Sequence, residues 1–261
     1  MENWYYNAIE SISNTLNTFS VYLNNLYSTY YETINNALSA ITNKFAELAK
    51  NIEEWSRPYR AIQTLANSQY VFWDYLDEVF IDTVLESKNI NKTLRILNSK
   101  ANYAETMNII SKCLESSHIK PYEKLFLQSV NAFKHGDNEL SILGFISIID
   151  GLLSDVSYNS TTSVYKRADA ILNKIENSEA IENDDYAILS LVMTFRDTME
   201  SFSKNESFDN PEPKNLNRHW IMHGRSRRRK TKLDCIKMIR FIYGIILIDK
   251  LTREEMSTEN E

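Results

Sequence analysis

The sequence predicts an almost entirely α-helical protein, with a long N-terminal helical or coiled-coil region followed by a C-terminal helical bundle. The chain has only 5 glycines and 4 prolines in 261 residues, which leaves few turn signals for a fold of many short strands. Its apolar residues instead recur at steps of three and four along extended stretches, the spacing of one face of an α-helix. Apolar residues make up 43% of the chain, enough to fill a core, so we do not expect a disordered protein.

Residues 1–57 are expected to form a long amphipathic helix or a coiled coil. The segment contains neither glycine nor proline, and its apolar positions follow a heptad-like spacing. These positions are Ile9, Ile12, Leu16, Phe19, Leu23, Leu26, Tyr30, Ile34, Leu38, Ile41, Phe45, Leu48, Ile52 and Trp55. Such a seam packs either within one chain, as a helical hairpin or bundle, or between chains, as a self-associating coiled coil. Both arrangements remain open.

Residues 58–118 are expected to form a further helical region, which Pro58 separates from the first segment. An aromatic-rich stretch at about 59–87 has helical spacing, and we interpret its aromatic side chains as core. The polar residues 91–105 are expected to hold a short helix and a connection. Another helix is predicted over 106–118.

Residues 119–251 are expected to form the C-terminal bundle. Pro121 suits the first turn of a helix over 122–134, and Gly136 supplies the turn that ends it. Asp137 is the expected N-cap of the next helix, over 138–156. Further helices are predicted at 164–177 and 184–203.

The C-terminal part of the chain begins with a polar segment at 204–216 that contains two prolines and is expected to be an extended loop. The last helix is expected to begin near Asn217 and to reach about Leu251, with a kink or break at a basic stretch. Residues 252–261 form an acidic segment that we expect to be a flexible tail.

Cysteine usage and the apolar runs predict a cytoplasmic protein that does not enter a membrane. Cys113 and Cys235 are far apart in sequence, and the first residues lack the pattern of a signal peptide. The longest apolar run, 241–248, is less than half of the ~20 residues that span a bilayer. We therefore interpret this run as part of a buried helix.

Positive charge is concentrated between residues 201 and 240. This stretch has eleven Lys and Arg against four Asp and Glu, whereas the whole chain has a formal net charge of −6. A polyanion would therefore meet one attractive region on a repulsive body, which focuses binding at that region.

The basic stretch begins with the string NRHWIMHG, residues 217–224. Asn217 is the predicted N-cap, so Arg218, His219 and His223 are expected in the first two turns of the final helix. His219 and His223 are four residues apart and share a helix face, whereas only the long side chain of Arg218 can reach the same ligand as His223. Gly224 removes a side chain where a substrate or a second backbone can approach.

Three interpretations of this string remain open. In the first, the histidines cap or pack the helix and the arginines form a solvated face. In the second, His219 and His223 are two zinc ligands, although a metalloprotease has Glu directly after the first His and Trp220 stands there. In the third, a histidine transfers protons near neutral pH and an arginine holds a phosphate, which is sufficient chemistry for metal-free cleavage of RNA.

The string RHWIMH, residues 218–223, resembles the R-x(4–6)-H motif of HEPN-domain ribonucleases. The longer NLNRHWIMHGR is similar to a form found in bacterial HEPN-like and abortive-infection-like proteins, and FKHGDNELSILGFISIIDGLLSDV resembles the helix pair that opens those domains. The resemblance covers about half of the chain. It implies a small helical bundle in which the motif opens a late helix.

The resemblance also implies an activity without any cofactor or metal. A HEPN endoribonuclease cleaves single-stranded RNA through attack of the ribose 2′-hydroxyl, which leaves a 2′,3′-cyclic phosphate and a 5′-hydroxyl. Carried onto this sequence, His223 transfers protons and Arg218 stabilises the transition state, while His219 orients the pair or binds substrate. In the family two copies of the site meet across a dimer.

The arginine and lysine residues after the motif are candidates for sequence-independent contacts with the RNA backbone. They are Arg225, Arg227, Arg228, Arg229, Lys230 and Lys232. A protein contact is the alternative for the same residues. Asn217 and Gly224 are expected to support the site.

Asp150 lies in the apolar stretch LGFISIIDGLL, on the helix face that also carries Ile142, Leu143, Ile146 and Leu153. A carboxylate on such a face needs a partner, so Asp150 either pairs with Arg218, orients a histidine, or reaches solvent. The first two roles resemble that of an acidic residue in parts of the family. His118 and His135 lie beside a proline and a glycine and are expected to be structural.

Two functional hypotheses follow. In the first, the N-terminal region mediates assembly or senses a trigger, and the C-terminal bundle is a HEPN-like ribonuclease that acts as a toxin or antiviral effector. Its expected partners are RNA, a second copy of the chain, and an antitoxin or a phage-derived trigger. In the second, the bundle does not cleave and binds RNA or a protein through its basic face.

Overall fold

The computed structural model describes residues 56–74, 76–157 and 186–258. The predicted coiled coil, apart from its last two residues, and the predicted helix at 164–177 lie outside these ranges. The chain divides into two compact units after Arg60, and the description below concerns the unit that starts at Ala61. Its described residues form helices and no strand, which confirms the all-α prediction there.

The helices alternate with short connections and two 3-10 segments. The α-helices are α3 (Ser56–Asn67), α4 (Glu78–Leu85), α5 (Ile90–Ser99), α6 (Ala104–Glu115), α7 (Glu123–His135), α8 (Asn138–Ser157), α10 (Tyr186–Ser203), α11 (Arg218–Met222) and α12 (Lys232–Thr258). The 3-10 segments are η1 (Lys100–Tyr103) and η2 (Ser117–Tyr122).

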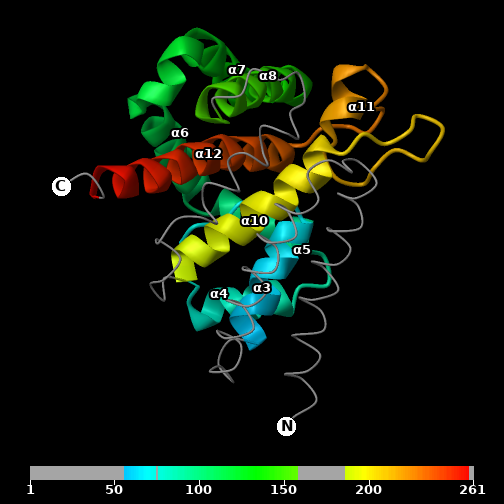
Figure 1. The fold of residues 1–261 in the computed structure, drawn as a ribbon. Helices are drawn as coiled ribbons and strands as arrows, with labels where there is room; N and C mark the ends of the chain where they lie inside the picture. The colour runs from blue at the N-terminus through cyan, green and yellow to red at the C-terminus, as the bar shows by residue number, and fades with distance from the viewer. Residues whose placement is uncertain (1–55, 75, 158–185, 259–261) are drawn as a thin grey trace, which may run out of the picture. The chain divides into compact units, whose positions relative to one another are not determined.

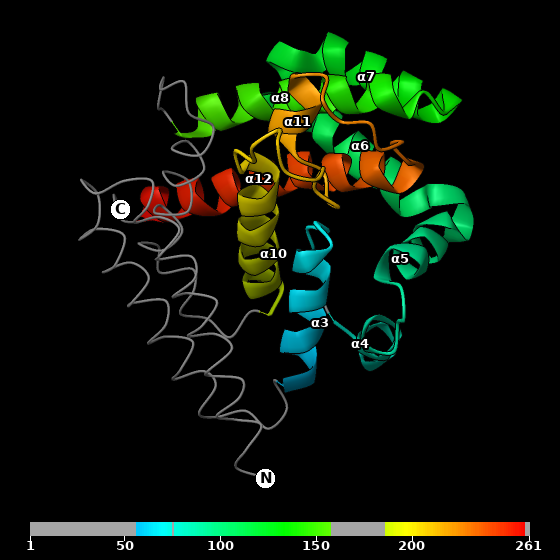
Figure 2. The ribbon, with the colours of Figure 1, turned by 90° about the vertical axis from the view of Figure 1, so that its right-hand side faces the viewer.

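Helix α12 runs through the middle of this unit. It packs against α8 and α6 and also touches α10 and α5. The antiparallel pair α7 and α8 lies on one side of α12 and α10 lies on the other (Figures 1 and 2). The apolar run 241–248 belongs to α12 and is buried apart from Leu247, which confirms the predicted buried helix.

Helices α7 and α8 form the hairpin that the sequence predicts. Gly136 has φ +86°, a left-handed conformation that glycine adopts without strain, and its amide donates to the carbonyls that end α7. Among the described residues, α8 is long and apolar enough to cross a membrane, and 56% of its most apolar 18-residue window is buried inside the protein.

The aromatic stretch at 59–87 is core as predicted, but it is not continuously helical. Helix α3 ends at Asn67, and the buried residues Tyr70, Val71 and Phe72 lie in an extended connection before α4. Tertiary contacts satisfy this backbone: the Phe72 amide donates to Thr194 Oγ1 at 2.9 Å, and the Val71 carbonyl accepts from Arg240. Helical spacing in the sequence does not reveal these partners.

Arg240 is the cation at the centre of this connection and is only 1% exposed. Its Nε donates to the Val71 carbonyl at 2.8 Å, and Nη1 donates to Glu105 Oε1 at 2.6 Å. The guanidinium carbon lies 4.3 Å from the ring centroids of both Tyr70 and Trp73. Paired and stacked in this way, Arg240 joins α12 to α6 and to the extended connection.

The predicted break in the last helix is present, and the helix that follows it is longer than predicted. The last helix does break at the basic stretch, so α11 ends at Met222 and α12 begins only at Lys232. At its other end α12 continues to Thr258, beyond the predicted end near Leu251.

Residues on both sides of position 118 belong to this one unit. Helix α12 packs against α5 and α6, which precede that position. His118 Nε2 lies 2.6 Å from Asp249 Oδ2 and joins η2 to the far half of α12, in keeping with a structural role. His135 at the end of α7 is exposed, and its Nδ1 lies 2.9 Å from the Asn131 carbonyl oxygen.

We expect Lys237 to make folding stability depend on pH. This α12 side chain is 4% exposed, its Nζ donates to Asn91 Oδ1 at 2.8 Å, and burial lowers its pKa to about 8. Between pH 8 and about 10.4, the ordinary lysine pKa, the unfolded chain keeps the proton that the folded protein has lost. Lys237 therefore makes the free energy of unfolding rise with pH across that interval, by about 1.4 kcal/mol per pH unit.

The measurement is urea unfolding of the wild type and of Lys237→Met at pH 7, 9 and 10. The buried thiols of Cys113 and Cys235, whose pKa burial raises to about 12, titrate on unfolding in the same interval, so the difference between the two proteins is the informative quantity. We expect the wild type to gain about 2–3 kcal/mol relative to Lys237→Met over this range. A difference that stays constant with pH would contradict the prediction.

Candidate functional site

Helix α11 lies against α8 (Figure 2), and the ion pair of Arg218 with Asp150 joins these two helices. Arg218 Nε donates to Asp150 Oδ1 at 2.8 Å and Oδ2 at 3.0 Å, and Nη2 donates to Oδ2 at 2.5 Å. The two side chains are 29% and 22% exposed. The predicted pairing of Asp150 with Arg218 is therefore confirmed. The carboxylate fixes the direction of the guanidinium while part of it stays open to solvent.

Helix α11 has the predicted start but is shorter than predicted. Asn217 Oδ1 accepts from the Trp220 amide at 3.1 Å, which confirms Asn217 as the N-cap. Its Nδ2 donates to the Lys204 carbonyl at 2.8 Å and so ties α11 to the end of α10. Trp220 and Ile221 are buried and hold the helix on the core.

His223 lies at the C-terminal end of α11 rather than in a second helical turn. The helix has five residues, His223 is its C-cap, and Gly224 follows with φ +64°. The chain turns there because glycine adopts the left-handed conformation without strain. Gly224 thus supports the site by ending the helix, and His223 is left exposed.

The two histidine rings form a cluster with Phe208 from the loop between α10 and α11. The imidazoles of His219 and His223 have ring centroids 4.6 Å apart. Phe208 stacks parallel on His219, with centroids 4.6 Å apart and an angle of 3° between the planes. The same phenyl ring meets His223 edge to face at 5.7 Å. Both predicted histidines therefore contact one aromatic ring.

The pKa of His219 is lowered by its surroundings. Burial lowers the pKa of His219, and the charges of His223 and Arg218 lower it further. At neutral pH the imidazole of His219 is therefore predominantly uncharged, because its ordinary pKa is already about 6.5. A neutral imidazole both donates and accepts hydrogen bonds, so His219 can orient a neighbouring group or a ligand.

The carboxylate of Glu212 holds the start of the basic stretch. Its oxygens accept from the amides of Arg227 and Arg228 at 2.9 and 3.1 Å and from the Ser226 hydroxyl. Burial alone would raise the pKa of Glu212, but these hydrogen bonds and the charge of Lys230 lower it below its ordinary value. Residues 226–228 are therefore held in one conformation by an ionised acid.

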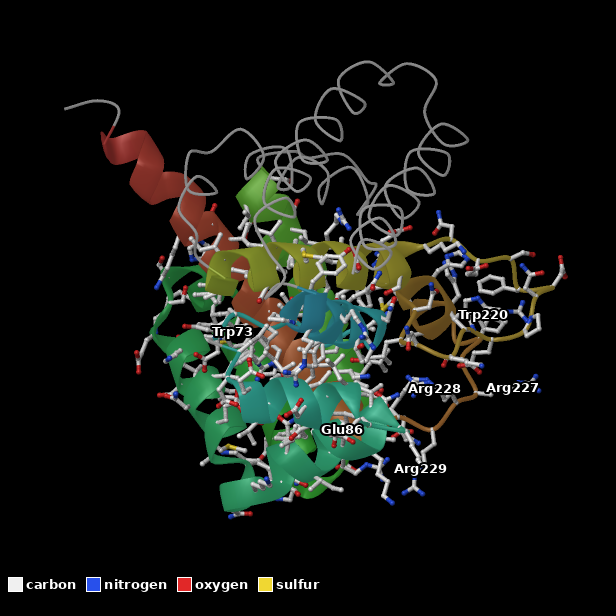
Figure 3. All side chains as sticks on the ribbon, turned by 90° about the horizontal axis from the view of Figure 1, so that it is seen from below. Trp73, Glu86, Trp220, Arg227, Arg228 and Arg229 are labelled. Atoms are coloured by element: carbon white, nitrogen blue, oxygen red, sulfur yellow. The ribbon has the colours of Figure 1, made fainter. Side chains whose placement is uncertain are left out.

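The structure divides the six predicted RNA-binding residues into two groups. Arg225, Arg227 and Arg229 are exposed, and Figure 3 shows Arg227 and Arg229 at the edge of the molecule. Arg228 is turned toward Asp234, with Nη1 3.2 Å from Oδ2.

The two lysines of this group make internal contacts. Lys230 is 5% exposed, its Nζ donates to the Arg228 carbonyl at 2.7 Å and to Ser226 Oγ, and burial lowers its pKa. Lys232 lies over Tyr103, with Nζ 4.3 Å from the ring centroid. Of the six predicted RNA-binding residues, Arg225, Arg227 and Arg229 are therefore the exposed ones. The other three cations interact within the protein.

The sequence pattern marks neither Phe208 nor Glu212 as functional. Both lie in the polar, proline-containing loop 204–216, where no periodic spacing marks a side chain as functional. The signal that could have pointed to Phe208 is that it is an aromatic residue among Asn, Asp, Ser and Pro. For Glu212, an isolated acid before a run of arginines was the corresponding signal.

Comparison with protein-family models, curated proteins and solved structures gave no match for this chain. Within the described ranges, no three His, Cys, Asp or Glu side chains are grouped so as to hold a metal ion. The candidate site therefore combines a fixed guanidinium, a neutral imidazole, a second, exposed imidazole, and three exposed arginines.

Proposed function

We propose that this chain is a metal-independent endoribonuclease of the HEPN type that cleaves single-stranded RNA and serves as a toxin or antiviral effector. The observation that carries the proposal is that one short helix and its C-cap present Arg218, whose guanidinium Asp150 orients, together with the exposed His223, whose ring lies 4.6 Å from that of His219. A fixed cation and an imidazole that can accept and donate a proton are the two groups that this reaction needs.

In the proposed reaction, neutral His223 accepts the proton of a ribose 2′-hydroxyl. The 2′-oxygen bonds to the adjacent phosphorus, the bond from phosphorus to the 5′-oxygen breaks, and the imidazolium returns the proton to that leaving oxygen. Arg218 neutralises the charge that gathers on the phosphoryl oxygens. The products are a 2′,3′-cyclic phosphate and a 5′-hydroxyl.

The assembly and setting that we propose follow from the same resemblance. Two copies of the chain would bring two R-x4-H motifs to one cleft, and residues 1–57 would mediate assembly or sense a trigger. An antitoxin or a phage-derived molecule would control the activity in the cytoplasm. A mass measurement in solution tests the assembly, and a strictly monomeric protein that cleaves RNA would exclude the composite cleft.

The proposed activity is tested by incubating the purified full chain with an unstructured RNA in EDTA. We expect cleavage that persists in EDTA, with 2′,3′-cyclic phosphate ends detected by mass spectrometry of the fragments. An RNA carrying a 2′-deoxy sugar at each cleaved position should resist cleavage there, because the attacking hydroxyl is absent. Activity that EDTA abolishes, or products with 5′-phosphate ends, would contradict the mechanism.

A second function is favoured by one contact. The guanidinium of Arg218 already has a carboxylate partner in Asp150, so less of its charge is free for a phosphate. The alternative is a bundle that binds RNA or a protein without cleaving. Binding of RNA with no cleavage by the wild type would support this alternative over the ribonuclease.

A further inference from the structure

Phe208 is the exposed aromatic residue beside the candidate site. It is 36% exposed, although it contacts His219, Trp220 and His223. Burying an aromatic ring fully is favourable, so a phenyl ring kept at the surface has a cost unless another molecule covers it. Its position next to both histidines means that such a molecule would lie at the proposed site of cleavage.

The loop around Phe208 holds the ring in place. Ser207 Oγ accepts from the Asp209 amide at 3.2 Å, and the Asn210 amide donates to the Ser207 carbonyl at 3.1 Å, so the residues on both sides form a tight turn. On the far side of this turn, Glu212 fastens the loop to residues 226–228. An aromatic ring held in this way loses little conformational entropy when a flat ligand stacks on it.

A positive charge lies against the exposed ring. The guanidinium of Arg225 lies over Phe208, with its central carbon 5.3 Å from the ring centroid, and the side chain of Arg225 is exposed. Arg227 and Arg229 follow on the same segment and are also exposed. A flat π surface bordered by arginines is the combination that binds single-stranded nucleic acid, because each base can stack and each phosphate meets a cation.

We infer that Phe208 is a stacking platform for one unpaired nucleobase, with Arg225 as its cationic partner. His219 stacks on one face of the phenyl ring and Arg225 lies over the ring, so the bound base takes the place of the Arg225 guanidinium on the ring. Arg225 then stacks on that base or contacts the neighbouring phosphate. Stacking does not depend on base identity, so the site accepts all four bases. This inference rests on the proposed function, since it places the stacked nucleotide beside His223.

The test measures binding separately from cleavage. The probe is a fluorescent eight-nucleotide RNA with 2′-O-methyl sugars, which cannot be cleaved by attack of a 2′-hydroxyl. The affinity is measured by anisotropy for the intact probe and for probes with one abasic site at each position in turn. We expect the wild type to bind one of the abasic probes about 5- to 150-fold more weakly, equivalent to ~1–3 kcal/mol for a stacked base.

The matching variants are Phe208→Ala, which removes the ring, Phe208→Leu, which keeps apolar cover over the histidines, and Phe208→Tyr, which keeps the ring. The alanine and leucine variants are expected to bind the intact probe only as weakly as the wild type binds the abasic probe of reduced affinity. For these variants, removing the base from that position should cause no further loss of affinity. The tyrosine variant should behave as the wild type. Thermal unfolding of each variant checks that the fold is intact.

Several outcomes would overturn the inference. Phe208→Ala could bind the intact probe as tightly as the wild type, or it could keep the same sensitivity to the abasic site, or the wild type could fail to bind the probe. Cleavage of unmodified RNA is scored in parallel. If binding depends on Phe208 and on the presence of the base but no RNA is cleaved, the stacking platform is supported and the proposed ribonuclease is excluded. If RNA is cleaved equally well with and without Phe208, the ribonuclease is supported and the platform is excluded.

Discussion

Replacing His223 with alanine is expected to lower the rate of RNA cleavage by about 10²- to 10⁴-fold, the usual contribution of a group that transfers protons in the transition state. The variant should fold normally, because His223 is exposed and ends a helix whose contacts with the core come from Trp220 and Ile221. The measurement is single-turnover cleavage of an unstructured RNA in EDTA, followed by gel electrophoresis.

Replacing Arg218 is also expected to lower the rate of RNA cleavage strongly, but for a different reason than replacing His223. Arg218→Ala removes the cation and leaves Asp150 without that partner, whereas Arg218→Lys keeps a charge but loses the fork that grips the carboxylate. We expect the alanine variant to be the slower of the two, at about 10²- to 10³-fold below the wild type.

The controls come from outside the site. His135→Ala removes an exposed histidine at the end of α7, and Arg95→Ala removes an exposed arginine in α5. Both variants should cleave RNA at the wild-type rate. Full activity in His223→Ala, or an equal loss in His135→Ala, would exclude His223 as the proton-transferring group.

Arg240→Ala is expected to lower the free energy of unfolding by about 3–4 kcal/mol. The substitution leaves the buried Val71 carbonyl without its donor, which costs ~1–3 kcal/mol, and removes the cation from the faces of Tyr70 and Trp73, at ~0.5–2 kcal/mol each. The measurement is urea unfolding followed by far-UV circular dichroism, with Arg95→Ala as the exposed control, which should change stability by less than ~0.5 kcal/mol.

A second variant separates the two parts of the Arg240 environment. Glu105 is 59% exposed, so water can replace its ion pair, and Glu105→Gln is expected to cost less than ~1 kcal/mol. If Glu105→Gln destabilised the protein as strongly as Arg240→Ala, the ion pair rather than the carbonyl and the aromatic rings would hold this connection.

Most of the helices in the described ranges could be predicted from local pattern. The bounds of α7, α8 and α10 follow from apolar spacing and from Gly136, because a helix depends on contacts between residues three and four apart that the sequence displays directly. The extended segment at Tyr70–Phe72 could not be predicted in this way. Its backbone is satisfied by Thr194 and Arg240, more than one hundred residues away in the chain.

The candidate site shows the same division. The pairing of Asp150 with Arg218 could be predicted because a carboxylate within an apolar helix face needs a cation, and Arg218 stood in the one string that suggested chemistry. The place of Phe208 could not be predicted, since a loop without periodicity carries no signal of which ring it will meet. The exposure of each basic side chain could not be predicted either, because burial of Lys230 depends on how residues 226–230 fold back.

The sequence by itself determined the helical class, the hairpin of α7 and α8, the break in the last helix region, and Arg218 with the two histidines as the residues of interest. These follow from spacing, composition and capping, which are properties of neighbouring residues. Only the tertiary structure decided which cations are exposed, which residues line the site, and that the rings of His219 and His223 lie against each other and against Phe208. Those facts depend on contacts between segments distant in the chain, whose energies are set by burial and pairing rather than by local sequence.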